Sequence, residues 1–232
     1  MRTLVLSPHF DDAPLSLGQA MLDGELAADR VTVGVVFGRT NWQRWFHPTR
    51  RRAPLVRAIR RAEEAVASRR FSYRVTTAGL EEVILRTGSS DTASYLDPGL
   101  ALPSDLVDAV AAAITTWVDV ADRVFAPLGL GGHVDHRLVR EGARRVVPVE
   151  RLAFYEDRPY ACYLSESDVA AAAAEVDPAL APRDASGPIG RSKVGRLWYP
   201  SQFDGFFTDA MRRDTEAGRP ERVWSVAAGT GR

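Results

Sequence analysis

Near its N-terminus the chain reads Leu4-Val5-Leu6-Ser7-Pro8-His9-Phe10-Asp11-Asp12, an apolar run followed by a His and two Asp. The apolar run predicts a buried parallel strand over 3–6, and the leucines that follow predict a helix over 14–26. The His and the two Asp are therefore expected on the turn at the carboxyl end of the first strand. In an open α/β sheet, ligands bind at this edge.

A second polar cluster, Gly131-Gly132-His133-Val134-Asp135-His136, follows another apolar run over 123–127. The chain has four His, and two of them lie here, three residues apart. In a helix that starts near Val134 they are about one turn apart and can face the same point. Taken alone, the Asp pair can be helix N-terminal acids and His133 a turn residue. The two clusters together, each after a predicted strand, predict one site.

Strands and helices alternate along most of the chain. Strands are predicted over 31–37, 71–77, 124–126 and 152–155, and helices over 55–70, 104–118, 134–147 and 165–176. This alternation predicts an α/β fold, a three-layer α/β/α Rossmann-like sandwich with a mainly parallel sheet. No linker divides the 232 residues, so we expect a single domain over 1–232, with rim or lid insertions near 38–54 and 88–103.

Composition narrows the class of partner. The chain has 30 basic residues (Lys and Arg) and 30 acidic residues (Asp and Glu), so its formal net charge is zero. This charge does not indicate binding to nucleic acid or to an anionic membrane. Cys162 is the only cysteine, which excludes an intramolecular disulfide and a cysteine zinc cluster. We expect a cytoplasmic protein with no signal peptide and no membrane span, acting on a small molecule. The Pro/Gly-rich segment 180–200 is interpreted as a loop or as a bridge in a homo-oligomer.

Three residues of the two clusters can bind one metal ion together. His9, Asp12 and His136 offer two imidazoles and a carboxylate, which suit zinc or another divalent cation such as Fe²⁺. Three protein ligands leave a position open for water, as catalytic sites do. The sequence therefore predicts a catalytic metal centre.

The remaining polar residues of the clusters have predicted catalytic roles. Asp11 is expected to take a proton from the attacking water. His133, as an imidazolium, is expected to stabilise the oxyanion or to protonate the leaving amine. Asp135 is expected to hold the His133 ring and raise its pKa. These parts predict metal-assisted hydrolysis of an amide.

Both motifs resemble those of the PIG-L/LmbE family of zinc-dependent deacetylases, whose members carry S-P-H-x-D-D after the first strand and H-x-D-H later. These correspond to residues 7–12 and 133–136, and residues 154–160 are similar to the F-Y-E-D-x-P-Y segment of one bacterial branch. The resemblance implies the LmbE-type fold and zinc bound by His9, Asp12 and His136. It also implies removal of an N-acetyl or related acyl group from an amino sugar, such as an N-acetylglucosamine derivative, or from its conjugate.

Substrate contacts are predicted for five further residues, which lie on an aromatic loop, a basic helix, a short acidic stretch and a strand end: Trp42, Arg61, Glu82, Arg86 and Tyr155. Two alternatives stay open. One is an amidase or de-N-acylase acting on a thiol conjugate or another non-sugar substrate. The other is a catalytically idle sugar-binding relative, which the presence of both Asp11 and His133 argues against.

Overall fold

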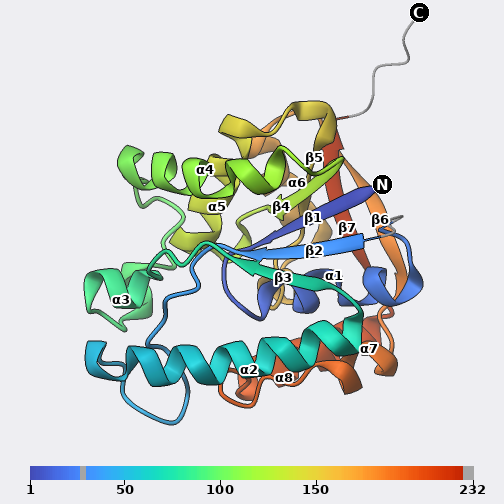
Figure 1. Cartoon of the computed structure of the whole chain (residues 1–232). Helices are drawn as coiled ribbons and strands as arrows, with labels where there is room; N and C mark the ends of the chain where they lie inside the picture. Colours follow the sequence, from blue (N-terminus) through green and yellow to red (C-terminus); the bar gives the residue numbers. More distant parts are fainter. Residues whose placement is uncertain (27–29, 227–232) are drawn as a thin grey trace, which may run out of the picture.

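Seven strands form one sheet in the order β3-β2-β1-β4-β5-β7-β6 (Figure 1). The structure is a computed structural model that describes residues 1–26 and 30–226. The strands are β1 (Arg2–Ser7), β2 (Arg30–Val35), β3 (Arg74–Thr77), β4 (Arg123–Pro127), β5 (Leu152–Tyr155), β6 (Leu180–Pro188) and β7 (Pro220–Val226). Strands β1 to β5 pair in parallel, whereas β7 is antiparallel to both β5 and β6.

Helices cover both faces of this sheet. They are α1 (Asp12–Asp23), α2 (Ala53–Phe71), α3 (Val83–Thr87), α4 (Ser104–Val118), α5 (Val134–Val146), α6 (Glu166–Val176), α7 (Arg191–Arg196) and α8 (Gly205–Ala217). Figure 1 shows α2, α7 and α8 below the sheet and α4 and α5 above it. The predicted three-layer α/β/α sandwich with a mainly parallel sheet is confirmed.

Each face of the sheet has its own apolar core. Ile114 of α4 and Leu138 of α5 pack against Leu4 and Leu6 of β1 on one face. Val5, which alternates with those leucines, packs on the other face with residues of α1 and α2. A strand that is buried on both faces needs a continuous apolar run, and this is what the sequence of β1 provides.

The segment 180–200 differs from its predicted structure. Segment 180–200 contains β6 and α7, so its interpretation as a loop is wrong. β6 is one of the two edge strands of the sheet, a position where Pro182 and Pro188 are tolerated because an edge strand leaves some backbone groups unpaired. The predicted strand over 71–77 begins at Arg74, since α2 continues to Phe71 and ends at Ser72, which has a left-handed φ of 60°.

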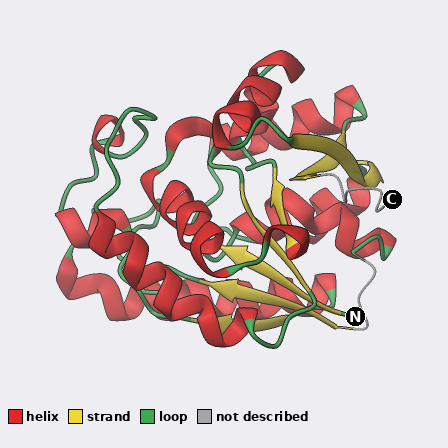
Figure 2. Ribbon diagram, turned by 90° about the horizontal axis from the view of Figure 1, so that it is seen from above, coloured by secondary structure: helices red, strands yellow, loops and turns green. Residues whose placement is uncertain are grey.

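The strand order changes direction at β1. Its neighbours are β2 on one side and β4 on the other, and the chain fills the two sides in turn. The parallel strands in Figure 2 point toward one edge of the sheet, where the connecting loops gather. The segments that follow β1 and β4 therefore meet at the switch point of the sheet, where α/β proteins bind ligands.

Within residues 1–26 and 30–226, no helix is both long enough and apolar enough to cross a bilayer.

Candidate metal centre and active site

The turn after β1 is fixed by its own hydrogen bonds. Ser7 Oγ donates to the carbonyl of His9 (2.6 Å) and accepts from the backbone N–H of Ala13 (3.1 Å). The backbone N–H of His9 donates to Asp12 Oδ2 (2.7 Å). The turn therefore places the His9 ring and the Asp12 carboxylate side by side at the start of α1.

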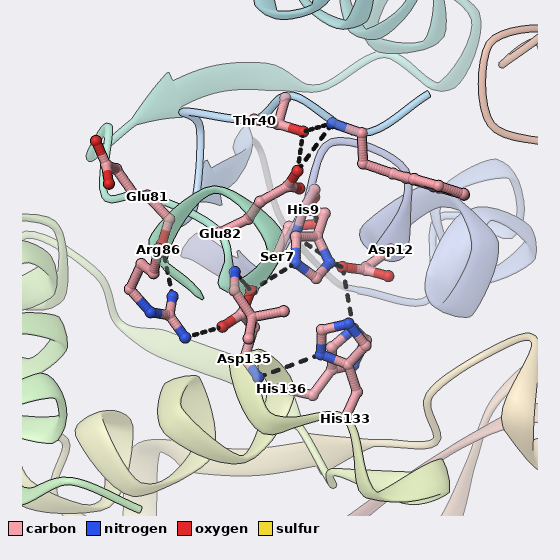
Figure 3. A network of polar contacts seen from close by, with 12 residues as sticks. Ser7, His9, Asp12, Thr40, Glu81, Glu82, Arg86, His133, Asp135 and His136 are labelled. Carbon is pink, nitrogen blue, oxygen red and sulfur yellow. Dashed lines mark hydrogen bonds and ion pairs between the residues drawn. The ribbon is translucent and has the colours of Figure 1, made fainter. Parts of the chain in front are cut away.

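The second motif brings two more imidazoles to the same point. Gly131 and Gly132, with φ of 75° and 74°, let the chain turn sharply before α5. His133 precedes the helix and His136 lies in its first turn. The His9 ring centroid is 5.0 Å from that of His133 and 5.4 Å from that of His136. Figure 3 shows the three rings with Asp12 in one cluster, as the sequence predicts.

Three donor atoms in this cluster converge. Asp12 Oδ2 lies 3.2 Å from His9 Nδ1 and 3.4 Å from His136 Nε2, and the ligand atoms of the three residues are all within 4.8 Å of one another. His9, His133 and Asp135 form a second group within the same limit. The Asp135 carboxylate already accepts from Arg86 Nη2 (2.8 Å) and from the backbone N–H of Val83 (2.9 Å), so the first group is the better ligand set.

Each proposed imidazole ligand has a carboxylate at its other ring nitrogen. His9 Nε2 is 3.1 Å from Asp135 Oδ2, and His136 Nδ1 is 2.6 Å from Asp157 Oδ1. Asp135 also accepts from Arg86 Nη2 (2.8 Å). A histidine that binds a metal usually donates its second N–H to a carboxylate in this way, which fixes its tautomer and its ring orientation.

The charges of the cluster also suit a cation. Burial alone lowers the pKa of an imidazole, but the carboxylates of Asp12 and Asp135 raise the pKa of His9 to about 10. Burial likewise opposes ionisation of Asp12, yet His136 and His9 hold the pKa of this carboxyl well below its usual range. The site favours positive charge among its imidazoles, and a divalent metal ion supplies it. The donor set and its charge therefore fit a divalent metal.

Asp11 lies beside the donor set and is held by a buried arginine. Arg60 Nη2 donates to Asp11 Oδ1 (2.8 Å), and both side chains are buried. Burial raises the pKa of Asp11, while Arg60 opposes that rise. Arg60 also lies 3.5 Å from Glu82 Oε2. The arginine thus joins the predicted base to a second buried carboxylate.

A cavity of about 230 Å³ opens over the cluster. Its polar lining includes His9, Asp11, Asp12, Arg60, Glu82, His133, His136 and Gln202, and its apolar lining includes Trp42, Val83, Ile84, Tyr95, Leu96, Tyr160, Phe206 and Phe207. The segments over 38–54 and 88–103 contribute Trp42, Tyr95 and Leu96, and α8 contributes the two phenylalanines. A larger cavity, of about 340 Å³, lies beside α6 and includes none of the clustered residues.

The Asp135 carboxylate does not hold the His133 ring in the way that the sequence predicts. The Asp135 carboxylate contacts His9 and Arg86, and only its backbone N–H reaches His133, donating to Nδ1 (3.2 Å). Burial, followed by the nearby His136 and His9, holds the pKa of His133 well below its usual range. A neutral His133 that accepts at Nδ1 has its N–H at Nε2.

The predicted substrate residues divide into two groups. Trp42 and Glu82 line the cavity. Arg61 is exposed and lines a separate depression, and Tyr155 is fully buried with its hydroxyl donating to the carbonyl of Leu6 (2.9 Å), so neither residue lines the cavity. Arg86 lies behind the cluster, on Asp135, and does not line the cavity.

Several residues of the site were missed. Arg60 adjoins the predicted Arg61, and only its buried contact with Asp11 distinguishes it. Asp157 belongs to the 154–160 segment noted in the sequence and lies two residues after the end of β5. The aromatic residues Phe206 and Phe207 carry no sequence signal that separates them from ordinary core residues.

The whole chain is similar to a known deacetylase, although no protein-family model matches it. The chain is 34% identical over 241 residues to 2'-N-acetylparomamine deacetylase of Streptomyces fradiae, and the aligned part covers 99% of this chain and 84% of that protein.

Solved structures of similar fold include three deacetylases. A40926 pseudoaglycone deacetylase Dbv21 has a TM-score of 0.63 and 21% identity, with 98% of each chain covered. A deacetylase triple mutant involved in teicoplanin biosynthesis has a TM-score of 0.66 and 22% identity, with 100% of each chain covered. The zinc-inhibited form of teicoplanin deacetylase Orf2 has a TM-score of 0.64 and 20% identity, with the same coverage. At these identities the likeness shows a shared fold.

Proposed function

Since the chain belongs to the PIG-L/LmbE family of N-deacetylases, we propose that it is a zinc-dependent hydrolase that removes an N-acetyl group from an amino sugar within a larger conjugate. The observation that supports this most is the meeting of five side chains at one cavity. His9, Asp12 and His136 are the proposed ligand set, and Asp11 and His133 line the cavity beside them.

The bound metal would supply Lewis acidity, which lowers the pKa of a water and polarises the amide carbonyl. Asp11 lies next to the proposed ligand Asp12 and faces the cavity. We therefore assign Asp11 as the general base that accepts a proton from the attacking water. Arg60 keeps that carboxylate in place through the 2.8 Å contact. Once Asp11 has accepted the proton, it can return it to the nitrogen of the leaving amine, so the protons balance over the reaction.

His133 is assigned to the carbonyl oxygen. Its Nδ1 accepts the backbone N–H of Asp135, so the neutral ring has a donor at Nε2. Negative charge develops on the carbonyl oxygen in the transition state. A hydrogen-bond donor held at that point lowers the activation barrier, and it does so without giving up its proton. This geometry favours oxyanion stabilisation over protonation of the amine.

Zinc is the metal we assign to the site. Two imidazoles and one carboxylate form a common ligand set of catalytic zinc, with a further position open. The test is metal analysis of the purified protein together with acetate release from methyl N-acetyl-β-D-glucosaminide. We expect about one zinc per chain, loss of acetate release with a chelator, and recovery with added zinc. Because Orf2 is known in a zinc-inhibited form, zinc is added back stoichiometrically.

Three outcomes contradict parts of this proposal. Recovery with Fe²⁺ but not with zinc would overturn the choice of metal. Release of a longer acyl chain, or hydrolysis of a non-sugar amide alone, would replace the deacetylase assignment by that of a de-N-acylase or amidase. Binding of the glycoside without hydrolysis at any metal content would indicate a sugar-binding relative.

A further inference from the structure

A row of aromatic rings leads from the surface to the cluster of His9, Asp12 and His136. Tyr163 stacks on Phe206, with ring centroids 4.9 Å apart and an interplanar angle of 7°. Phe206 lies 6.3 Å from Tyr160, whose ring meets the edge of His136 at 6.0 Å. Phe206 is 43% exposed and lines the cavity, so part of its ring is open to solvent there. Tyr163 supports this ring from outside the cavity, and its own ring also lies against the Arg213 guanidinium, 4.9 Å from the ring centroid.

Trp42 adds a further aromatic ring to the same cavity, and it is 37% exposed. Glu82 Oε1 accepts the backbone N–H groups of Asn41 (3.2 Å) and Trp42 (3.1 Å). The backbone N–H of Arg44 donates to the carbonyl of Ser201 (2.8 Å), which joins this loop to the segment before α8. The ring is therefore carried on a loop that is tied at both ends.

The carboxylates around the cavity are already paired. Asp11 is bound to Arg60 and Asp12 lies among the imidazoles. Glu82 is occupied by the backbone of the Trp42 loop. On α8, Asp209 accepts from the Tyr163 hydroxyl and pairs with two arginines of the same helix. Among the described residues of the cavity, no exposed carboxylate is left for a cationic group of the substrate.

We propose that the part of the conjugate attached to the amino sugar is a flat aromatic or apolar aglycone, which packs against the exposed rings of Trp42 and Phe206 in the cavity, and that it is not a polycation. This rests on the proposed deacetylase function for the position of the sugar. Exposed aromatic rings stabilise a flat apolar group by stacking, whereas the cavity offers a cationic group no unpaired carboxylate. One stacked ring corresponds to about 2- to 10-fold in affinity.

The experiment compares three N-acetylated compounds in the zinc-loaded enzyme. They are 4-nitrophenyl N-acetyl-β-D-glucosaminide, its methyl analogue, and 2'-N-acetylparomamine, which has free amino groups on its aglycone. We measure KM and kcat by acetate release, and we measure Kd for the three deacetylated products by calorimetry. We expect the KM of the aryl compound to be about 2- to 10-fold lower than that of the methyl compound, and the Kd of the aryl product to be lower than that of the methyl product by the same factor. We expect no such gain for the paromamine compound.

Variants locate the effect on the surface. In Trp42→Ala and Phe206→Ala the ratio of kcat/KM for aryl over methyl glycoside should fall toward one. Trp198→Ala is the matched control, because this ring is 45% exposed and does not line the cavity. It should keep the full ratio.

Equal Kd values for the aryl and methyl products, tighter binding of the paromamine product, or an unchanged ratio in both variants would overturn the proposal. If none of the three compounds releases acetate, the proposed function fails. The aglycone proposal then stands or falls on the Kd values alone.

Discussion

Asp157→Asn is expected to weaken zinc binding about 10- to 100-fold, the usual effect of losing a partner of a metal ligand. This corresponds to about 1.4 to 2.7 kcal/mol. The Asp157 carboxylate has two separate tasks, and each oxygen performs one. Oδ1 accepts from His136 Nδ1 (2.6 Å), and Oδ2 accepts the backbone N–H groups of Gly129 (2.7 Å) and Leu130 (3.0 Å).

An asparagine has one oxygen for these two tasks. If that oxygen faces the backbone of Gly129 and Leu130, the amide NH₂ faces His136. The imidazole must then accept at Nδ1 and carry its proton at Nε2, the nitrogen that faces Asp12 and the metal. If the amide turns round, its NH₂ opposes two buried N–H donors, at a cost of about 1–3 kcal/mol. Either orientation weakens the site.

The assay is competition for zinc against a chromophoric chelator, accompanied by urea unfolding of the metal-free protein. Asp214→Asn is the control, because Asp214 is also buried and pairs with Arg158, and it belongs to neither metal-binding group. That variant should lower the urea midpoint and leave zinc affinity unchanged. Wild-type zinc affinity in a folded Asp157→Asn protein would refute the assigned orientation of His136.

Three further predictions concern proton transfer, a buried acid and the core. Asp11→Asn should lower kcat about 10²-fold or more while zinc content stays the same; an unchanged kcat would remove Asp11 as the base. Burial raises the pKa of Glu64 from 4.5 to about 8, so its contribution to stability is complete below pH 4.5 and is lost as the pH rises through about 8. In Glu64→Gln the urea midpoint should vary less with pH over this range, and an unaltered profile would contradict the shift. Ile114→Ala should cost about 2–5 kcal/mol in urea unfolding and leave the kinetics of the folded enzyme alone; a loss under 1 kcal/mol, well below that range, would show that the core closes over the gap.

The sequence predicted the parallel strands and the meeting of the two polar clusters because both depend on local features. A strand that is buried on both faces must be apolar throughout, so β1 is recognisable in isolation. His9 and Asp12 follow β1 directly, and His136 lies just beyond β4, which is the neighbour of β1 in the sheet. Parallel strands bring such segments to the same edge.

The partners of these ligands depend on tertiary structure and were not predictable. Asp135 lies two residues from His133, which suggested a contact, but helical residues two apart point in different directions. Its true partner, His9, is 126 positions away along the chain. Arg60 and Arg61 are chemically the same, and which one is buried depends on where α2 meets Asp11.

The antiparallel end of the sheet was missed for a different reason. β6 contains two prolines and a glycine, a composition that local rules assign to loops. Such a strand is possible only because it lies at the edge, next to β7. The sequence of β6 alone does not say that it has this position.

The segment after β5 constrains any redesign of substrate range. Asp157, which orients a proposed metal ligand, and Tyr160, which walls the cavity, are three positions apart. A Cβ on Gly131 would lie 2.3 Å from the Tyr160 ring, so the backbone of Gly131 packs closely against this ring and limits its movement. Changes there would alter metal affinity together with selectivity. Directed evolution toward new conjugates should therefore begin at Trp42 and Phe206, where the wall can be rebuilt with less risk to metal affinity.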